Sequence, residues 1–298
     1  MIQENNTDDN ISFVHDKYIV IKKLGKGKFG MVLLGKDITN EEDVAIKIEK
    51  IGNLSSIKHE VKIMNYLFQN KFRNLPKTYW YGKQDIYTCL VMSYYDCSIT
   101  QWCNHNESLE IIGFSTIMYN CINILSEIHK RHVIHRDIKP QHFMMKKGEL
   151  FLIDFGLATF TIDNNGEIIQ DTTQTDIIGT PNYISINHHY GHKPNKRDDL
   201  ISLGYMMLKL IHGNLPWEAS PNIFRELPNN NSSNFINDLN HPLNIYKKDK
   251  KEWNNLIPVL ETTNEKLFQL YPFIKYCYRL SYNDNPNYEL LLQFFTSC

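Results

Sequence analysis

Three glycines mark a loop that is suited to phosphate binding. Gly25, Gly27 and Gly30 lie in the run GKGKFGMV, between two predicted strands. Glycines let backbone amides approach a polyphosphate because no Cβ stands in the way. A dinucleotide-binding fold uses a similar spacing, but there a helix follows, whereas residues 31–34 favour a strand, and no Gly-Lys-Ser/Thr is present. On its own the loop is equally compatible with an ordinary hairpin.

A lysine follows an apolar run typical of a buried strand. Lys47 comes directly after Val44-Ala45-Ile46, where an ammonium is unfavourable unless it meets an anion. Glu60, on a predicted helix, is its candidate ion-pair partner. Without Lys47, Glu60 would be interpreted as a solvated helix charge. The lysine therefore favours the phosphate-binding interpretation of the loop.

Two aspartates follow predicted elements at a spacing that suits phosphoryl transfer. Asp137 lies in His135-Arg136-Asp137-Ile138-Lys139-Pro140, and Asp154 begins Asp154-Phe155-Gly156 after an apolar strand. Asp137 would accept or orient the proton of a substrate hydroxyl, Lys139 would neutralise the transferred phosphoryl group, and Asp154 would hold Mg²⁺. Alone, Asp-Phe-Gly would indicate only a turn. Four motifs in this order make coincidence very improbable.

From about residue 14 to 298 the chain resembles eukaryotic-type protein kinases, and specifically the casein kinase 1 group, which includes the vaccinia-related kinases. The group-specific segments are GTPNYISIN at 179–187, KRDDLISLGY at 196–205 and LPW at 215–217. Lysine two residues after Asp137 is the serine/threonine form. The resemblance implies a kinase that uses ATP with a divalent cation, Mg²⁺ or Mn²⁺, and acts on protein substrates.

The resemblance also assigns the remaining site residues. Met92 would be the gatekeeper, and backbone groups of Tyr95 would hold adenine within a hinge at 93–97. Asp199 would brace the catalytic loop, and Thr180 joins the implied catalytic residues. The implied nucleotide-binding residues are Leu24, Gly25, Gly27, Gly30, Val32, Ala45, Lys47, Glu60, Met92 and Tyr95.

His142 departs from the family pattern. It stands five residues after Asp137, where the pattern has an Asn that binds a second Mg²⁺. We assign His142 to the metal site with Asp154, and as a ligand it would favour Mn²⁺ over Mg²⁺, which prefers oxygen. A packing or hydrogen-bonding role near Asp137 is an equal alternative. The departure also leaves a second hypothesis for the chain, a pseudokinase that binds nucleotide or a partner without catalysis.

Two further features bear on regulation and substrate choice. Threonines occur at three positions between 172 and 175, but the resembled group is commonly active without phosphorylation there, so we expect no such requirement. Asn182 replaces an Arg that captures phosphate on primed substrates in that group, so we expect weak preference for them. Lys193, Lys196 and Arg197 either preserve part of an anion site or are only surface charges.

Hydrophobic periodicity predicts the elements that position these residues. Short β-favouring runs are followed by amphipathic patterns that indicate helices. The predicted strands cover 18–24, 31–34, 44–48, 79–81, 87–92 and 150–153, and the predicted helices cover 57–68, 114–128, 200–210, 267–280 and 288–295.

These elements give an α+β chain with a bilobal protein-kinase fold. We expect a small antiparallel-sheet N-lobe with one helix at 14–92, the hinge, and a larger, mainly helical C-lobe at 98–298. Residues 1–13 are polar and expected to be disordered. Residues from about 228 to 255 are rich in Asn, Ser and Lys, which predicts a solvated insertion loop.

Bulk properties exclude several function classes. The net charge of −1 provides no general attraction to nucleic acid, and the lysine-rich run at 247–251 is more typical of a solvated charge run, so we expect no specific nucleic-acid partner. No signal peptide or membrane-length apolar run is present, and the cysteines are scattered, which indicates reduced thiols, a cytoplasmic location and no membrane partner. We expect a monomer. The Asn, Ile and Lys bias suggests an AT-rich genome such as that of a large cytoplasmic DNA virus, which would place the protein in the host cytoplasm or virion.

Overall fold

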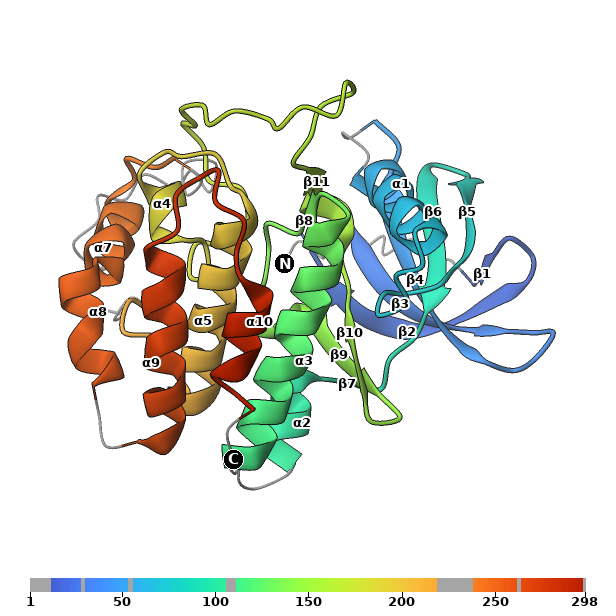
Figure 1. Cartoon of the computed structure of the whole chain (residues 1–298). Coiled ribbons are helices and arrows are strands. Elements are labelled where there is room, and N and C mark those ends of the chain that lie inside the picture. The colour runs from blue at the N-terminus through green and yellow to red at the C-terminus, as the bar shows by residue number, and fades with distance from the viewer. Residues whose placement is uncertain are drawn as a thin grey trace, which may run out of the picture.

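Two parts of different secondary structure make up the chain, one dominated by a sheet and one by helices (Figure 1). The computed structural model describes residues 12–27, 30–52, 56–105, 111–218, 238–261 and 264–296. The predicted α+β organisation, with an antiparallel sheet first in the chain and helices mostly after it, is confirmed.

Six antiparallel strands form the sheet of the N-lobe, in the order β1-β2-β3-β4-β6-β5. They are β1 (Phe13–Val14), β2 (Tyr18–Lys26), β3 (Met31–Asp37), β4 (Asp43–Lys50), β5 (Thr78–Gln84) and β6 (Tyr87–Ser93). The register places Val32 opposite Lys47 and Ala45 opposite Met92. Helix α1 (Ser56–Gln69) packs beside this sheet through an apolar face at helical spacing, and Glu60 is buried on that face.

The C-lobe is built around α3 (Ile111–Lys130) and α5 (Lys196–His212), which contribute much of the larger hydrophobic core. Helix α5 begins with a capping box between Asn195 and Asp198 and ends at Gly213, whose φ of 77° suits glycine. The other described helices are α2 (Ile99–His105), α4 (Ile186–His189), α7 (Pro242–Lys251), α8 (Trp253–Leu260), α9 (Glu265–Tyr278) and α10 (Tyr288–Gln293).

Short strands in the C-lobe carry the loops on which the predicted catalytic residues lie. They are β7 (Cys97–Ser98), β8 (Val133–Ile134), β9 (Phe143–Lys146), β10 (Glu149–Leu152) and β11 (Thr159–Phe160). The β9–β10 hairpin pairs with β7, and β8 pairs with β11. The segment with the first aspartate therefore leaves β8 and enters β9, and the segment with the second runs from β10 to β11.

The prediction of a solvated loop at 228–255 is wrong for residues 242–255. Residues 228–237 lie outside the described residues, but α7 and the start of α8 occupy 242–255. Pro242 suits the first turn of a helix, and Leu243, Lys247 and Lys251 then recur at helical spacing and are buried. The lysine-rich run is consequently not wholly solvated. Of the terminus expected to be disordered, residues 1–11 are not described, and Phe13 belongs to β1.

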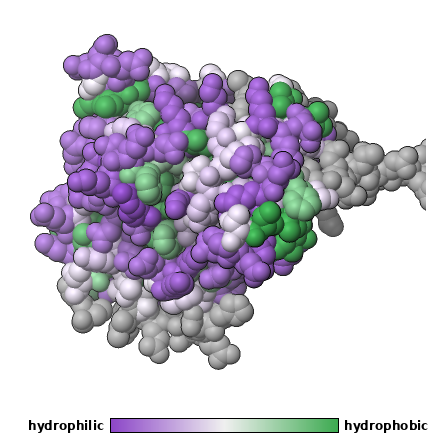
Figure 2. All heavy atoms as spheres, turned by 90° about the vertical axis from the view of Figure 1, so that its right-hand side faces the viewer, coloured by the Kyte–Doolittle hydropathy of each residue, from purple (hydrophilic) through white to green (hydrophobic). Residues whose placement is uncertain are grey.

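The face of the molecule in Figure 2 is largely hydrophilic, with separate small hydrophobic areas. Exposed apolar side chains along β2 include Ile19, Ile21 and Leu24. Of the helices that the structure describes, none combines the length and apolarity needed to span a bilayer. The described cysteines are free thiols, and burial raises the pKa of Cys121 and Cys277 well above the usual value.

Candidate active site

The glycine-rich loop joins β2 to β3 at one end of these paired strands. The Gly27 N–H donates to the Gly30 carbonyl over 2.8 Å. A Cβ added to Gly30 would lie 1.9 Å from the Ile48 carbonyl oxygen, so only glycine permits this approach to β4. A Cβ on Gly25 would meet nothing within 4 Å. The glycines in the described part of the loop therefore leave its backbone uncovered by side chains at these positions. Leu24, which precedes the loop, is 43% exposed.

Lys47 lies between two carboxylates from different parts of the chain. Its Nζ is 2.7 Å from Glu60 Oε2 on α1 and 2.8 Å from Asp154 Oδ1. Burial alone would lower the pKa of Lys47, but the charges of Glu60 and Asp154 outweigh it and raise the pKa above the usual value. The predicted Lys47–Glu60 pair is present, and it fixes α1 against the sheet.

A carboxylate at the end of β4 holds the beginning of α1. Glu49 is 2% exposed, accepts from the Ile57 N–H over 3.3 Å and contacts the Ser56 hydroxyl. It thereby satisfies donors at a helix N-terminus that have no partner within the helix. Sequence reasoning missed Glu49 because an acidic residue at the end of a strand gives no pattern that distinguishes it from a surface charge.

The loop after β8 brings Asp137, Lys139 and Thr180 into mutual contact. Lys139 Nζ lies 2.6 Å from Asp137 Oδ2 and donates to Thr180 Oγ1 over 3.0 Å. The Thr180 hydroxyl donates to Asp137 Oδ1 over 2.7 Å. Burial alone would raise the pKa of Asp137, but the nearby His142 and Lys139 outweigh it and lower the pKa. Asp137 is thus held as a carboxylate next to a hydroxyl and an ammonium.

Asp199 braces this loop from α5, in the place that the resemblance implies. It is 2% exposed and accepts from the His135 N–H over 2.7 Å and the Arg136 N–H over 2.9 Å. His129 Nε2 lies 3.0 Å from the same carboxylate, and His129 Nδ1 contacts the Tyr288 hydroxyl. Burial would raise the pKa of Asp199, but His129 and the other donors outweigh it and lower the pKa. Sequence reasoning missed His129 and Tyr288.

Asp154 and His142 face each other beside Asp137. Asp154 has a left-handed φ of 62°, and its Oδ2 lies 3.3 Å from His142 Nε2. His142 Nδ1 is 2.9 Å from the Asp137 carbonyl oxygen, so it carries a proton there. In the neutral ring the Nε2 lone pair therefore points toward Asp154. Burial alone would raise the pKa of Asp154, but a hydrogen bond from the protonated His142 ring and the charge of Lys47 outweigh it and hold the pKa well below the usual value.

The residues assigned to the adenine site come from neighbouring strands and the hinge. Met92 pairs with Ala45 across β6 and β4, and Val32 packs against the large core from β3. Tyr95 follows β6, is 6% exposed and packs its ring against Phe151 at 4.7 Å between ring centroids. These residues lie along the junction between the lobes, next to the ion pair of β4.

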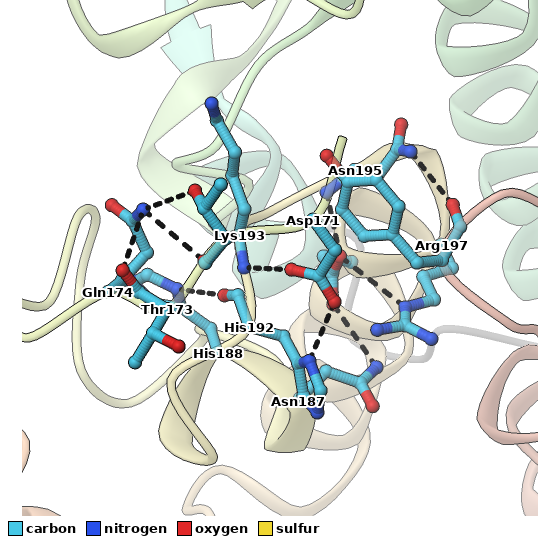
Figure 3. Close-up of polar contacts among 12 residues, drawn as sticks. Asp171, Thr173, Gln174, Asn187, His188, His192, Lys193, Asn195 and Arg197 are labelled. Carbon is cyan, nitrogen blue, oxygen red and sulfur yellow. Dashed lines mark hydrogen bonds and ion pairs between the residues drawn. The ribbon is translucent and has the colours of Figure 1, made fainter. Parts of the chain in front are cut away.

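A long segment after β11 crosses to α4 along the top of the view in Figure 1. Figure 3 shows how it is attached: Asp171 accepts from the Lys193 N–H over 2.9 Å, and its carboxylate lies 2.7 Å from His192 Nδ1. The Gln174 N–H also donates to the Gly191 carbonyl over 2.8 Å. An aspartate of the chain itself therefore holds this segment to the loop that follows α4.

The basic residues considered for an anion site have different surroundings. The Lys193 side chain points away from Asp171 in Figure 3. Lys196 Nζ donates to Asn285 Oδ1 over 2.7 Å. Arg197 is 7% exposed, and its Nη1 donates to the Leu280 carbonyl over 2.9 Å. Arg197 is consequently neither a surface charge nor directed to solvent as an anion receptor would be.

The structure thus brings the predicted phosphate-binding lysine, both aspartates, Thr180 and the nucleotide-site residues to one junction between two lobes. A comparison with protein families agrees with this arrangement. The family model described as "protein kinase domain" matches residues 18–292, which is most of the chain. The chain belongs to the protein kinase domain family.

Proposed function

We propose that the protein is an active serine/threonine kinase of the casein kinase 1 group, which transfers the γ-phosphoryl group of ATP to hydroxyls of protein substrates. Protein kinase domains use ATP and a divalent cation. The observation that carries the proposal is the contact among Asp137, Lys139 and Thr180 beside the Lys47–Glu60 pair. The lysine at 139 favours serine and threonine acceptors, and the composition bias supports a viral source, which would place the protein in host cytoplasm or the virion. We also propose that the protein is a monomer.

The chain's own groups can supply positioning and charge for this transfer. Asp137 is a carboxylate with low pKa, and it can accept a hydrogen bond from the acceptor hydroxyl and orient its oxygen. Lys139 can balance negative charge on the transferred phosphoryl group. Lys47, fixed by Glu60, can bind nonreacting phosphates of the nucleotide.

The donor set at Asp154 and His142 fits a divalent cation. Mg²⁺ in such sites is held through one or two carboxylates together with substrate phosphate oxygens. Asp154 offers a carboxylate in the left-handed backbone conformation, and His142 offers a nitrogen 3.3 Å from it. When bound, the cation would neutralise phosphate charge. We propose Asp154 as its main ligand and His142 as the second.

The alternative function is a pseudokinase, for which His142 is the only departure that we identify in the catalytic pattern. The geometry favours catalysis because Lys47, Asp137 and Asp154 all keep their partners. The loss of an Asn ligand alone removes none of these contacts.

Phosphate transfer from radiolabelled ATP to peptides with a single Ser, Thr or Tyr tests the proposal. We expect labelling of the Ser and Thr peptides, and loss of at least a hundredfold in Lys47→Met and Asp137→Ala. The first variant removes the charge that binds the nonreacting phosphates, and the second removes the carboxylate that orients the acceptor hydroxyl. Lys23→Met, on the exposed part of β2, is the matched control and should retain wild-type activity. Equally low labelling by wild type and both site variants would support the pseudokinase, and preferential labelling of the Tyr peptide would overturn the serine/threonine assignment.

A further inference from the structure

A buried lysine on α7 binds the backbone just after Thr180. Lys251 is 0% exposed, and its Nζ donates to the Pro181 carbonyl over 2.9 Å and to the Ile184 carbonyl over 2.8 Å. His189 Nε2 lies 3.1 Å from the same nitrogen. The two carbonyls lie at either end of the segment 181–184, so a single side chain spans it from beneath.

Two further side chains bind the residue in the middle of this segment. Trp217 Nε1 donates to the Asn182 carbonyl over 2.7 Å. The Asn182 side-chain oxygen accepts from Lys247 Nζ, one helical turn before Lys251 on α7. Asn182, the position at which the resembled group has a phosphate-capturing Arg, is thus turned toward the protein. These two bonds and the two from Lys251 to backbone carbonyls all go to the segment 181–184.

Burying the Lys251 side chain costs desolvation free energy, which its contacts with the segment 181–184 must offset. Burial lowers its pKa well below the usual value. Within the described part of the chain its partners are carbonyls, the His189 ring and the faces of Tyr205 and Trp217, at 5.0 and 5.3 Å, and no carboxylate forms an ion pair with it. An apolar side chain of this size would fill the same space without the desolvation cost. What it could not do is bind the two carbonyls.

The segment 181–184 in turn holds Thr180. The N–H groups of Tyr183 and Ile184 donate to the Thr180 carbonyl over 2.8 and 3.1 Å. The Thr180 hydroxyl contacts Asp137. A continuous series of hydrogen bonds therefore runs from Lys251 to the carboxylate proposed to orient the acceptor hydroxyl, and a shift of about 1 Å in such a series is enough to impair catalysis.

We propose that Lys251 and Lys247 are positioning residues for the protein substrate. Through these two side chains, α7 fixes the segment 181–184, which receives the substrate peptide beside the acceptor hydroxyl. Because this segment binds Thr180, α7 also fixes Thr180. The proposal rests on the proposed kinase function for its catalytic consequence. Its structural part, the fixing of 181–184 by α7, holds with or without phosphoryl transfer.

Hydrogen exchange provides a test that is independent of activity. The variants are Lys251→Met and, as matched control on the same helix, Lys250→Met, whose side chain is 42% exposed. We expect exchange at the Tyr183 and Ile184 amides to be at least tenfold faster in Lys251→Met and unchanged in Lys250→Met. Unchanged exchange in Lys251→Met would overturn the proposal. Equal loss of protection throughout the C-lobe would also overturn it, because Lys251 would then be a general core residue.

Steady-state kinetics of the same full-length variants test the catalytic part. In Lys251→Met we expect kcat/KM for a Ser peptide to fall about tenfold or more. KM for ATP should change less than twofold, because the residues assigned to adenine and phosphate binding lie in the N-lobe and hinge. Equal fold-changes in kcat/KM for the peptide and in KM for ATP would contradict a role in peptide positioning. If Lys251→Met does not fold, Lys247→Met and Trp217→Phe take its place, since each removes one hydrogen bond to Asn182. The same exchange and kinetic measurements then apply, with smaller expected effects. If wild type transfers no phosphate, the proposed function fails, and the exchange result still decides the structural part.

Discussion

The hydroxyl of Thr180 provides a sharp test of the catalytic geometry. Thr180→Val keeps the shape of the side chain but removes the donor to Asp137 and the acceptor for Lys139. A hydrogen bond to a charged group contributes about 1.5–3 kcal/mol. Lys139 and Asp137 still pair directly at 2.6 Å, so the net loss should be that of one bond rather than two. We therefore expect kcat/KM to fall roughly 10- to 150-fold.

The matched control is Thr180→Ser, which keeps the hydroxyl and loses only a methyl group. Phosphorylation of a Ser peptide by both variants, with unfolding curves to verify the fold, measures the difference. Thr180→Ser should remain within about threefold of wild type. Because the Thr180 hydroxyl helps to lower the pKa of Asp137, the acid limb of the pH profile should move to higher pH in Thr180→Val. Equal losses in the two variants, or a Val variant with more than half the wild-type rate, would refute the role of the hydroxyl.

Three other predictions concern the metal site, the brace and the segment held by Asp171. His142→Asn should raise Mg²⁺-supported turnover and narrow any advantage of Mn²⁺, and a Mn²⁺/Mg²⁺ ratio that stays the same would exclude ligation. Asp199→Asn should lower the unfolding free energy by about 3 kcal/mol, since it leaves buried donors without a charged acceptor. Folding lowers the pKa of Asp199, so this stability is fully present above the unfolded pKa of about 3.9 and is lost as the pH falls from there through the folded pKa. A difference from wild type that does not begin to shrink below about pH 3.9 in urea titrations would contradict the assignment. Replacing the threonines at 172–175 with valine should leave most activity, whereas Asp171→Ala should lower it severalfold, and a tenfold loss in the valine variant alone would show a phosphorylation switch.

The sequence predicted the helices and strands that have strong hydrophobic periodicity. It also predicted the site residues that lie in short motifs. The strands β2 to β6 of the N-lobe, α1 and α5 lie where hydrophobic spacing placed them, whereas β1 was not predicted. The Lys47–Glu60 contact was also predicted: a charge in an apolar strand requires an anion, and the kinase pattern identified Glu60 as the ion-pair partner. Asp199 was assigned from the resemblance, and the structure places its carboxylate against the backbone of the catalytic loop.

Residues whose role depends on tertiary contacts could not be predicted. Lys247 and Lys251 lie in a run with other lysines and Asn-rich neighbours, which is typical of solvated segments, although the two are spaced by four and are both buried. Lys251 donates to two backbone carbonyls, and Lys247 donates to the side-chain amide oxygen of Asn182, all about 65 to 70 positions earlier in the chain. No sequence pattern identifies such acceptors. Glu49 was missed for the same reason, because its partners are a hydroxyl and an N–H at the start of a helix.

The contact between His129 and Tyr288 has a consequence for synthesis on the ribosome. The two residues are 159 positions apart, and the ring of His129 joins the hydroxyl of Tyr288 to the carboxylate of Asp199. At roughly 5–20 residues per second, Tyr288 is added on the order of 10 to 30 seconds after His129. During that interval a nascent chain can complete its N-lobe, but α3 still lacks its contacts with α10, and the brace behind Asp137 lacks its last member. A growing chain should therefore acquire its nucleotide-binding lobe well before its phosphotransfer geometry.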